Sequence, residues 1–137
     1  MLPRILRWLQ ARRTPRQRLE YIAPWTVSRD AHARGMLLLR ENLSPAQAHQ
    51  FAENGCFEVV GCDTGKRYRI KPWMPANIEE LDARGRRIRS WCFFPSGNLV
   101  TGDVLLAQKL ALELFESEAL AVANSMRHIT YPVRLSF

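Results

Sequence analysis

Two stretches of alternating cationic residues are the strongest candidates for chemistry in this sequence. The first alternates with apolar residues and comprises Arg67, Arg69 and Lys71. The second adds aromatic rings and comprises Arg87, Arg89, Trp91 and Phe93. Cationic groups neutralise phosphates and aromatic rings stack on bases, so this combination is typical of surfaces that bind single-stranded nucleic acid. The predicted contact residues are Arg67, Arg69, Lys71, Arg87, Arg89 and Trp91.

A predicted hairpin turn holds the triplet Asp63-Thr64-Gly65, which resembles the catalytic triplet of aspartic proteases. The resemblance covers these three residues and implies a carboxylate that activates water together with a second carboxylate from another copy of the chain. Asp and Gly are also the residues that a tight turn requires, and Lys66-Arg67 follow where that family has small residues. We therefore assign the triplet to the turn and predict no catalytic residues.

Three cysteines and one histidine are the possible zinc ligands: Cys56, Cys62, Cys92 and His49. Five residues separate Cys56 from Cys62, which is not the close spacing of a zinc knuckle, and ligands from three separate elements would have to converge. We expect structural cysteines, with neither a metal nor another cofactor. An odd number of cysteines also argues against a disulfide scaffold and predicts a reducing, cytoplasmic location.

The chain as a whole is basic. Its 137 residues include 20 Lys and Arg against 13 Asp and Glu, which gives a net charge of +7. Only three of the 20 cationic residues are lysine, so 17 are arginine, the better partner for phosphate. Hydrophobic residues make up 47%, which supports one folded core and excludes a disordered tail. No apolar run reaches the roughly 20 residues that a membrane-spanning helix needs.

Local signals predict two helices in the first half of the domain. The first helix begins at Ser28 or Asp30 and ends near Asn42, and the second begins after Ser44 and ends at Gly55. Ser44 is followed by Pro and, three residues on, by Gln, which is the pattern of a capping box. Glycine is the usual residue at a left-handed helix end.

From Phe57 the apolar period changes to two, which predicts an antiparallel meander of about four strands ending near Phe94. In the third strand Ile78 and Leu81 have unequal parity, which indicates a bulge. The fold class is therefore α+β, with N-terminal helices, the meander and a long C-terminal helix packed on the sheet.

The long helix is predicted to begin at Thr101 or Asp103 and to end near Asn124. Its length of about 30 Å is enough to cross a small sheet. The tail at 129–135 alternates weakly and predicts an additional edge strand.

Residues 1–27 form a predicted basic, amphipathic arm ahead of a single domain at 28–137. Apolar residues of the arm repeat at helical spacing: Leu2, Ile5, Leu6 and Leu9. Arg4 and Arg7 interrupt the apolar stretch of a secretory signal, whereas an acid-free, arginine-rich start is typical of a mitochondrial presequence. The alternatives for this helix are docking on the domain, on a partner protein or on anionic lipid.

These observations predict a small, basic, non-enzymatic binding protein that contacts RNA or DNA through a cationic sheet face. The alternative is an assembly or adaptor subunit that docks onto a larger protein complex through residues 1–20. The first hypothesis requires that the two cationic rows lie on one face of the sheet, and a shift of one residue in register would separate them.

Overall fold

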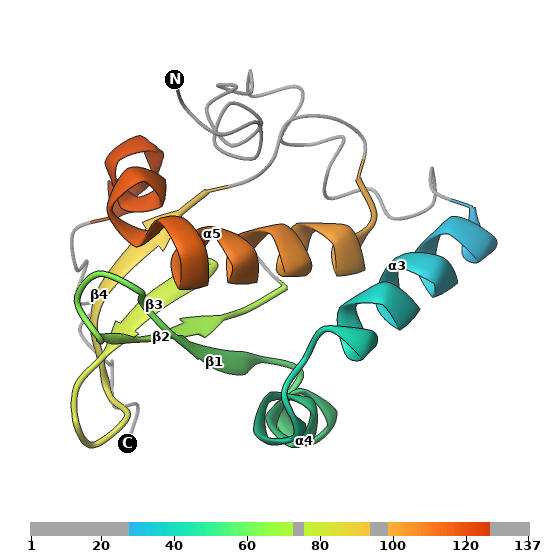
Figure 1. Ribbon diagram of the computed structural model, residues 1–137, viewed down its shortest axis with the longest axis horizontal. Coiled ribbons are helices and arrows are strands. Elements are labelled where there is room, and N and C mark those ends of the chain that lie inside the picture. Colours follow the sequence, from blue (N-terminus) through green and yellow to red (C-terminus); the bar gives the residue numbers. More distant parts are fainter. Residues whose placement is uncertain (1–27, 73–75, 94–98, 127–137) are drawn as a thin grey trace, which may run out of the picture.

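The computed structural model describes residues 28–72, 76–93 and 99–126, and it confirms the predicted α+β fold (Figure 1). Two helices come first, α3 (Arg29–Glu41) and α4 (Pro45–Asn54). Four strands follow: β1 (Phe57–Val60), β2 (Arg67–Ile70), β3 (Ile78–Leu81) and β4 (Arg87–Cys92). Helix α5 (Thr101–Val122) and the short strand β5 (Asn124–Met126) come last. The predicted arm at 1–27 and the weak strand at 129–135 lie outside these residues.

The ends of both early helices are the predicted ones. The Ser28 hydroxyl accepts the backbone N–H of Ala31 at 3.1 Å and caps α3. At α4 the Ser44 hydroxyl accepts the N–H of Gln47, and the Gln47 side chain accepts the N–H of Ser44 in return. Gly55 ends α4 with a φ of 68°, which glycine adopts at little cost.

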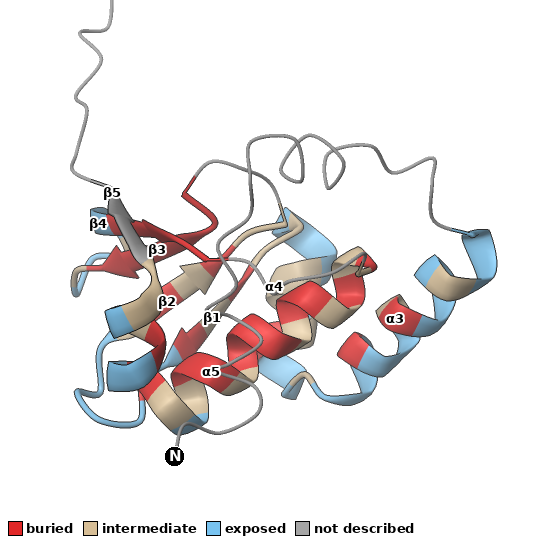
Figure 2. Ribbon diagram, turned by 90° about the horizontal axis from the view of Figure 1, so that it is seen from above, coloured by how far each residue is buried: buried red, intermediate tan, exposed pale blue. Residues whose placement is uncertain are grey.

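All five strands pair antiparallel in the order β1-β2-β3-β4-β5. Helix α5 crosses one face of this sheet, here called the helix face, while the opposite face is called the outer face (Figures 1 and 2). The core lies between α5 and the helix face, and its largest fully buried apolar side chains are Leu39, Phe57, Val59, Tyr68, Ile70, Ile78, Leu105 and Leu112. In the described part of the chain, no helix is long and apolar enough to cross a membrane.

The edge strand β1 is closed by glutamine side chains of α4. Gln50 Oε1 accepts the backbone N–H of Glu58 at 2.9 Å, and Gln47 Nε2 donates to the carbonyl of Glu58 at 3.0 Å. Unpaired backbone groups of an edge strand readily attract another strand. The two glutamines therefore occupy the place that a further strand would take beside Glu58.

A bulge interrupts the pairing of β3 with β4. The unequal parity of Ile78 and Leu81 predicted a bulge in the third strand itself, but β3 pairs with β2 in continuous register and these two residues lie on opposite faces. Glu80 pairs with Arg89, but Leu81 pairs with Arg87, so Ile88 is an extra residue on β4. Successive side chains of a strand point to opposite faces of the sheet. The extra residue therefore places the side chains of Arg87 and Arg89 on opposite faces, although they are two positions apart.

Helices α3 and α5 approach each other at two glycines. A Cβ atom on Gly102 would lie 2.2 Å from the backbone carbonyl of Gly35, and one on Gly35 would lie 2.3 Å from the Val100 side chain. The contact between α3 and α5 therefore requires that both positions lack a side chain.

We predict that Gly102→Ala destabilises the protein by about 2 kcal/mol, because the new methyl group must push the backbone of α3 away. Alanine has the higher helix propensity, so this loss would occur against an intrinsic gain of about 1 kcal/mol. Thermal or urea unfolding measures the change. Glu118→Ala, at an exposed position of the same helix, is the control and should change stability little. Equal stabilities of the two variants would contradict the close helix contact.

Candidate nucleic-acid interface

The turn between β1 and β2 packs against a kink in α5. Phe115 has non-helical backbone angles, φ −147° and ψ 44°, which distort the helical hydrogen bonding at this turn. The Leu112 carbonyl accepts the N–H of Cys62 at 3.2 Å, and the Glu116 N–H donates to Cys62 Sγ at 3.4 Å. Asp63 Oδ2 accepts both the N–H and the hydroxyl of Ser117. The turn thus satisfies the backbone groups that the kink leaves open.

The side chain of Glu116, on α5, also binds the β1–β2 turn. Its carboxylate is completely buried and accepts four hydrogen bonds: the N–H groups of Asp63 and Thr64 at 2.8 Å each, the Thr64 hydroxyl at 2.5 Å and the Tyr68 hydroxyl at 2.6 Å. Gly61 lies directly beside it, and a Cβ there would come within 2.2 Å of the carboxyl carbon. A buried charge with all its acceptor positions filled is an anchor between helix and sheet.

The hydrogen bonds decide which protonation state Glu116 adopts. Burial by itself raises the pKa of a carboxyl group, but the bonds from Thr64, Tyr68 and Asp63 outweigh it, and the pKa of Glu116 lies below its ordinary value. Burial and the bond to Glu116 raise the pKa of Tyr68. The pair is therefore an ionised carboxylate and a neutral phenol at neutral pH.

The protease-like triplet and Cys62 contribute hydrogen bonds between the β1–β2 turn and α5. Cys62, Asp63 and Glu116 are the one group of possible metal ligands that lie within 4.8 Å of one another in the described residues. The lone pairs of Glu116 are already occupied by donors, and Asp63 caps the second half of α5, so these groups act as structural acceptors. The set of Cys56, Cys62, Cys92 and His49 does not converge.

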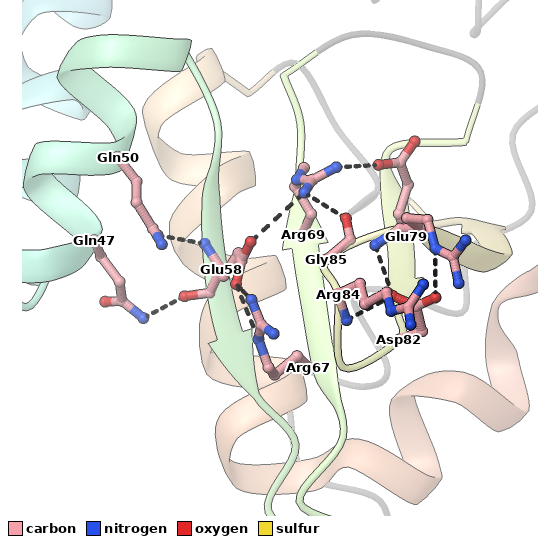
Figure 3. A network of polar contacts seen from close by, with 10 residues as sticks. Gln47, Gln50, Glu58, Arg67, Arg69, Glu79, Asp82, Arg84 and Gly85 are labelled. Atoms are coloured by element: carbon pink, nitrogen blue, oxygen red, sulfur yellow. Dashed lines mark hydrogen bonds and ion pairs between the residues drawn. The ribbon is translucent and has the colours of Figure 1, made fainter.

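The outer face carries the cations of β2 in a network with two carboxylates (Figure 3). Arg67 donates to Glu58 through Nε and Nη2, at 3.1 and 2.6 Å. Arg69 lies between Glu58 and Glu79, at 3.6 and 3.4 Å, and Lys71 Nζ contacts Glu79 at 2.6 Å. The predicted cationic row on one face of β2 is therefore present, but its charge is partly neutralised by neighbouring strands.

The second predicted row is divided by the bulge. Arg87 pairs across the strand with Leu81, as Arg67 does on the other side, so Arg87 joins the outer face and contacts Glu79 at 3.7 Å. Arg89 and Trp91 pair with Glu80 and Ile78, which share the helix face with Tyr68 and Ile70. The expectation that all six predicted residues lie on one face is wrong for Arg89 and Trp91.

Trp91 is a core residue. Its side chain leaves only 6% of its surface exposed and packs edge-on against the Tyr68 ring, with 5.9 Å between ring centroids. The guanidinium of Arg89 lies 5.6 Å from the Trp91 ring centroid and is exposed. The ring of Trp91 is thus unavailable for stacking on a base.

The hairpin between β3 and β4 adds arginines that the sequence analysis did not assign to the site. Asp82 accepts the N–H groups of Arg84 and Arg86 and the Nε of Arg86, and these bonds, from Arg86 first, lower the pKa of Asp82. Arg69 Nη2 donates to the carbonyl of Gly85 at 3.1 Å and ties the hairpin to β2.

Arg67 and Arg87 lie on the outer face on either side of Leu81, and Arg84 and Arg86 lie in the hairpin next to them; we call these four arginines the arginine cluster. The side chains of Arg67 and Arg87 expose 43% and 42% of their surface, and Arg84 and Arg86 are exposed residues. No ion pair joins Arg84 to another side chain within the described residues. The sequence sign that could have revealed the two hairpin arginines is the run of arginines around Gly85. The turn at Asp82 brings this run beside β2.

Glu116 was also missed, although the sequence contains a sign of its role. It follows Leu112 by four residues and precedes Ala119 by three, which places it on the buried stripe of α5. A carboxylate at such a position needs buried partners. The partners come from the β1–β2 turn, which no spacing within the helix indicates.

Comparison of the chain with protein-family models, with curated proteins and with solved structures found no match.

We predict that Glu116→Gln lowers the free energy of unfolding at neutral pH by about 3 kcal/mol. The amide turns one acceptor into a donor that faces other donors, and bonds to a buried carboxylate are strong. Chemical unfolding measures the loss, with Glu118→Gln on the exposed side of α5 as the control.

The same pair of proteins tests the pH dependence. A carboxyl group whose pKa is lowered by folding contributes stability above its unfolded pKa, about 4.5, and loses it as pH falls towards the folded pKa. The difference between wild type and Glu116→Gln should therefore narrow below pH 4.5. A constant difference down to acid pH would contradict an ionised Glu116.

Proposed function

We propose that this protein is a small, non-enzymatic binding protein that contacts the phosphate backbone of RNA or DNA through the arginine cluster. The observation that carries the proposal is that Arg67 and Arg87, each more than two fifths exposed, lie together on the outer face beside a hairpin that holds the exposed Arg84 and Arg86. One guanidinium group can donate two parallel hydrogen bonds to the oxygens of a phosphate, and it keeps its charge at any physiological pH.

The charge balance around the cluster supports an anionic ligand. Among the residues that the structure describes here, six cations face three carboxylates, which leaves an excess of positive charge. The carboxylates are Glu58, Glu79 and Asp82. Arg69 and Lys71 are the less exposed cations, and they position Glu58, Glu79 and the hairpin rather than contact the ligand themselves.

Burial of Trp91 supports contacts to phosphates instead of bases. Phosphate contacts orient a protein on nucleic acid but carry no direct sequence information. We therefore expect binding that depends weakly on base sequence and strongly on salt.

A cytoplasmic location belongs to the same proposal, because the number of cysteines is odd and Cys56 and Cys62 are free thiols, which a reducing compartment preserves. The alternative, an adaptor subunit that docks through its N-terminal helix, depends on residues 1–20, which lie outside the described residues.

We predict that Arg84→Gln/Arg87→Gln weakens binding and reduces its salt dependence. Each lost contact to duplex phosphate lowers the slope of log affinity against log salt by about 0.9, so the pair should lower it by about 1.8. Fluorescence anisotropy with labelled single-stranded and duplex oligonucleotides over a salt series measures both quantities. Arg84 and Arg87 have the weakest ion pairing in the cluster, so the fold should persist, which circular dichroism checks.

Arg34→Gln/Arg40→Gln is the matched control, since it removes the same charge from exposed positions of α3, at the other end of the molecule from the β3–β4 hairpin (Figure 1). The control should leave the salt slope unchanged. Equal losses in the two variants would mean that net charge alone drives binding, and no binding by wild type would overturn the proposal.

A further inference from the structure

The carboxylate of Glu58 binds the Nε–Nη2 edge of Arg67, which has the shortest ion pair in the arginine cluster. Its Oε2 accepts from Nε and Nη2 of Arg67 together, at 3.1 and 2.6 Å, while its Oε1 lies 3.6 Å from Arg69 (Figure 3). The Nε–Nη2 edge of a guanidinium is one of the forks that bind an oxyanion, whether carboxylate or phosphate. A phosphate that approaches Arg67 from this edge must therefore displace Glu58.

Glu58 and Glu79 differ in how easily they give up their partners. The Glu79 side chain is only 8% exposed and is surrounded by Arg69, Lys71 and Arg87, so its removal would leave charge without a partner inside the structure. The Glu58 side chain is 22% exposed and lies on the edge strand, and its pair with Arg67 is open to solvent. Partly exposed ion pairs are weak and exchange readily with other ions.

The position of Glu58 does not depend on Arg67. Its backbone is held by Gln47 and Gln50 of α4, and by β2 through the pairing with Arg69. The carboxylate therefore stays beside Arg67 whether or not the arginine is engaged, at high effective concentration.

We infer that Glu58 is a built-in competitor of the nucleic-acid phosphate for Arg67, and that it limits affinity at the arginine cluster. This inference rests on the proposed function. It predicts the regulation of the site: neutralising one acidic side chain outside the cluster strengthens binding because it frees a particular arginine, rather than because it raises the net charge.

Glu58→Gln tests this inference in the same anisotropy assay. The amide has nearly the same size as the carboxylate, and the backbone of residue 58 keeps its hydrogen bonds to Gln47 and Gln50. Only the negative charge is removed, so Arg67 becomes available to phosphate. We expect affinity to rise about two- to fivefold at low salt, the range that corresponds to one partly exposed ion pair. The salt slope should become steeper by about 0.9 for duplex.

Glu53→Gln is the matched control. Glu53 is exposed on α4 and has no ion pair within the described residues, and its substitution changes the net charge by the same amount. Its effect on affinity should be clearly smaller. Equal gains from Glu53→Gln and Glu58→Gln would overturn the inference, since net charge would then explain both.

A double-mutant cycle with Arg67→Gln identifies the arginine. In that background the gain from Glu58→Gln should disappear, because the group it frees is absent. A gain that persists, or wild-type binding that Glu58→Gln leaves unchanged, overturns the inference and leaves the proposed function standing. Absence of nucleic-acid binding in wild type and in Glu58→Gln alike overturns both.

Discussion

The buried carboxylate of Glu116 is the interaction on which the arrangement of helix and sheet depends. It joins α5 to the β1–β2 turn and to Tyr68, so one ionised group fixes the orientation of β2 relative to the helix. The kink at Phe115 and the turn at Cys62 are complementary, because each supplies the backbone or side-chain partners that the other lacks. A charge with this many donors is stable where an unpaired one would not be.

The orientation of β2 in turn decides what the outer face offers to a ligand. With Tyr68 and Ile70 directed into the core, the alternate residues Arg67 and Arg69 must point outward. Glu58 and Glu79 stand opposite Arg69 on the two neighbouring strands, and cross-strand pairs of opposite charge stabilise a sheet. The same carboxylates reduce the charge available to an anion, so the stability of the sheet and the strength of binding oppose each other at this face.

Local elements of this fold were predictable because local chemistry specifies them. The capping box at Ser44, the glycine end of α4 at Gly55 and the alternation along β2 each depend on residues within a few positions of one another. The spacing of Ile78 and Leu81 predicted a bulge in the wrong strand, because these residues face opposite sides of a regular β3 and the extra residue is on β4. The candidate site was less predictable: the face of Arg67, Arg69 and Lys71 was correct, whereas Arg89 and Trp91 were placed wrongly because the extra residue on β4 is Ile88, between Arg87 and Arg89.

By itself the sequence determined the helices α3, α4 and α5, the four strands β1 to β4 and the excess of arginine, since periodicity, caps and composition are properties of neighbouring residues. The short strand β5 (Asn124–Met126) was not predicted. Tertiary structure alone decided that Trp91 packs against Tyr68, that Glu116 receives the β1–β2 turn, and that Glu58 and Glu79 lie against the arginines. These contacts join residues far apart in the chain, and strand register determines them. A change of one residue in register moves a side chain to the other face of the sheet, so register decides whether a cation lies in a binding surface or over the core.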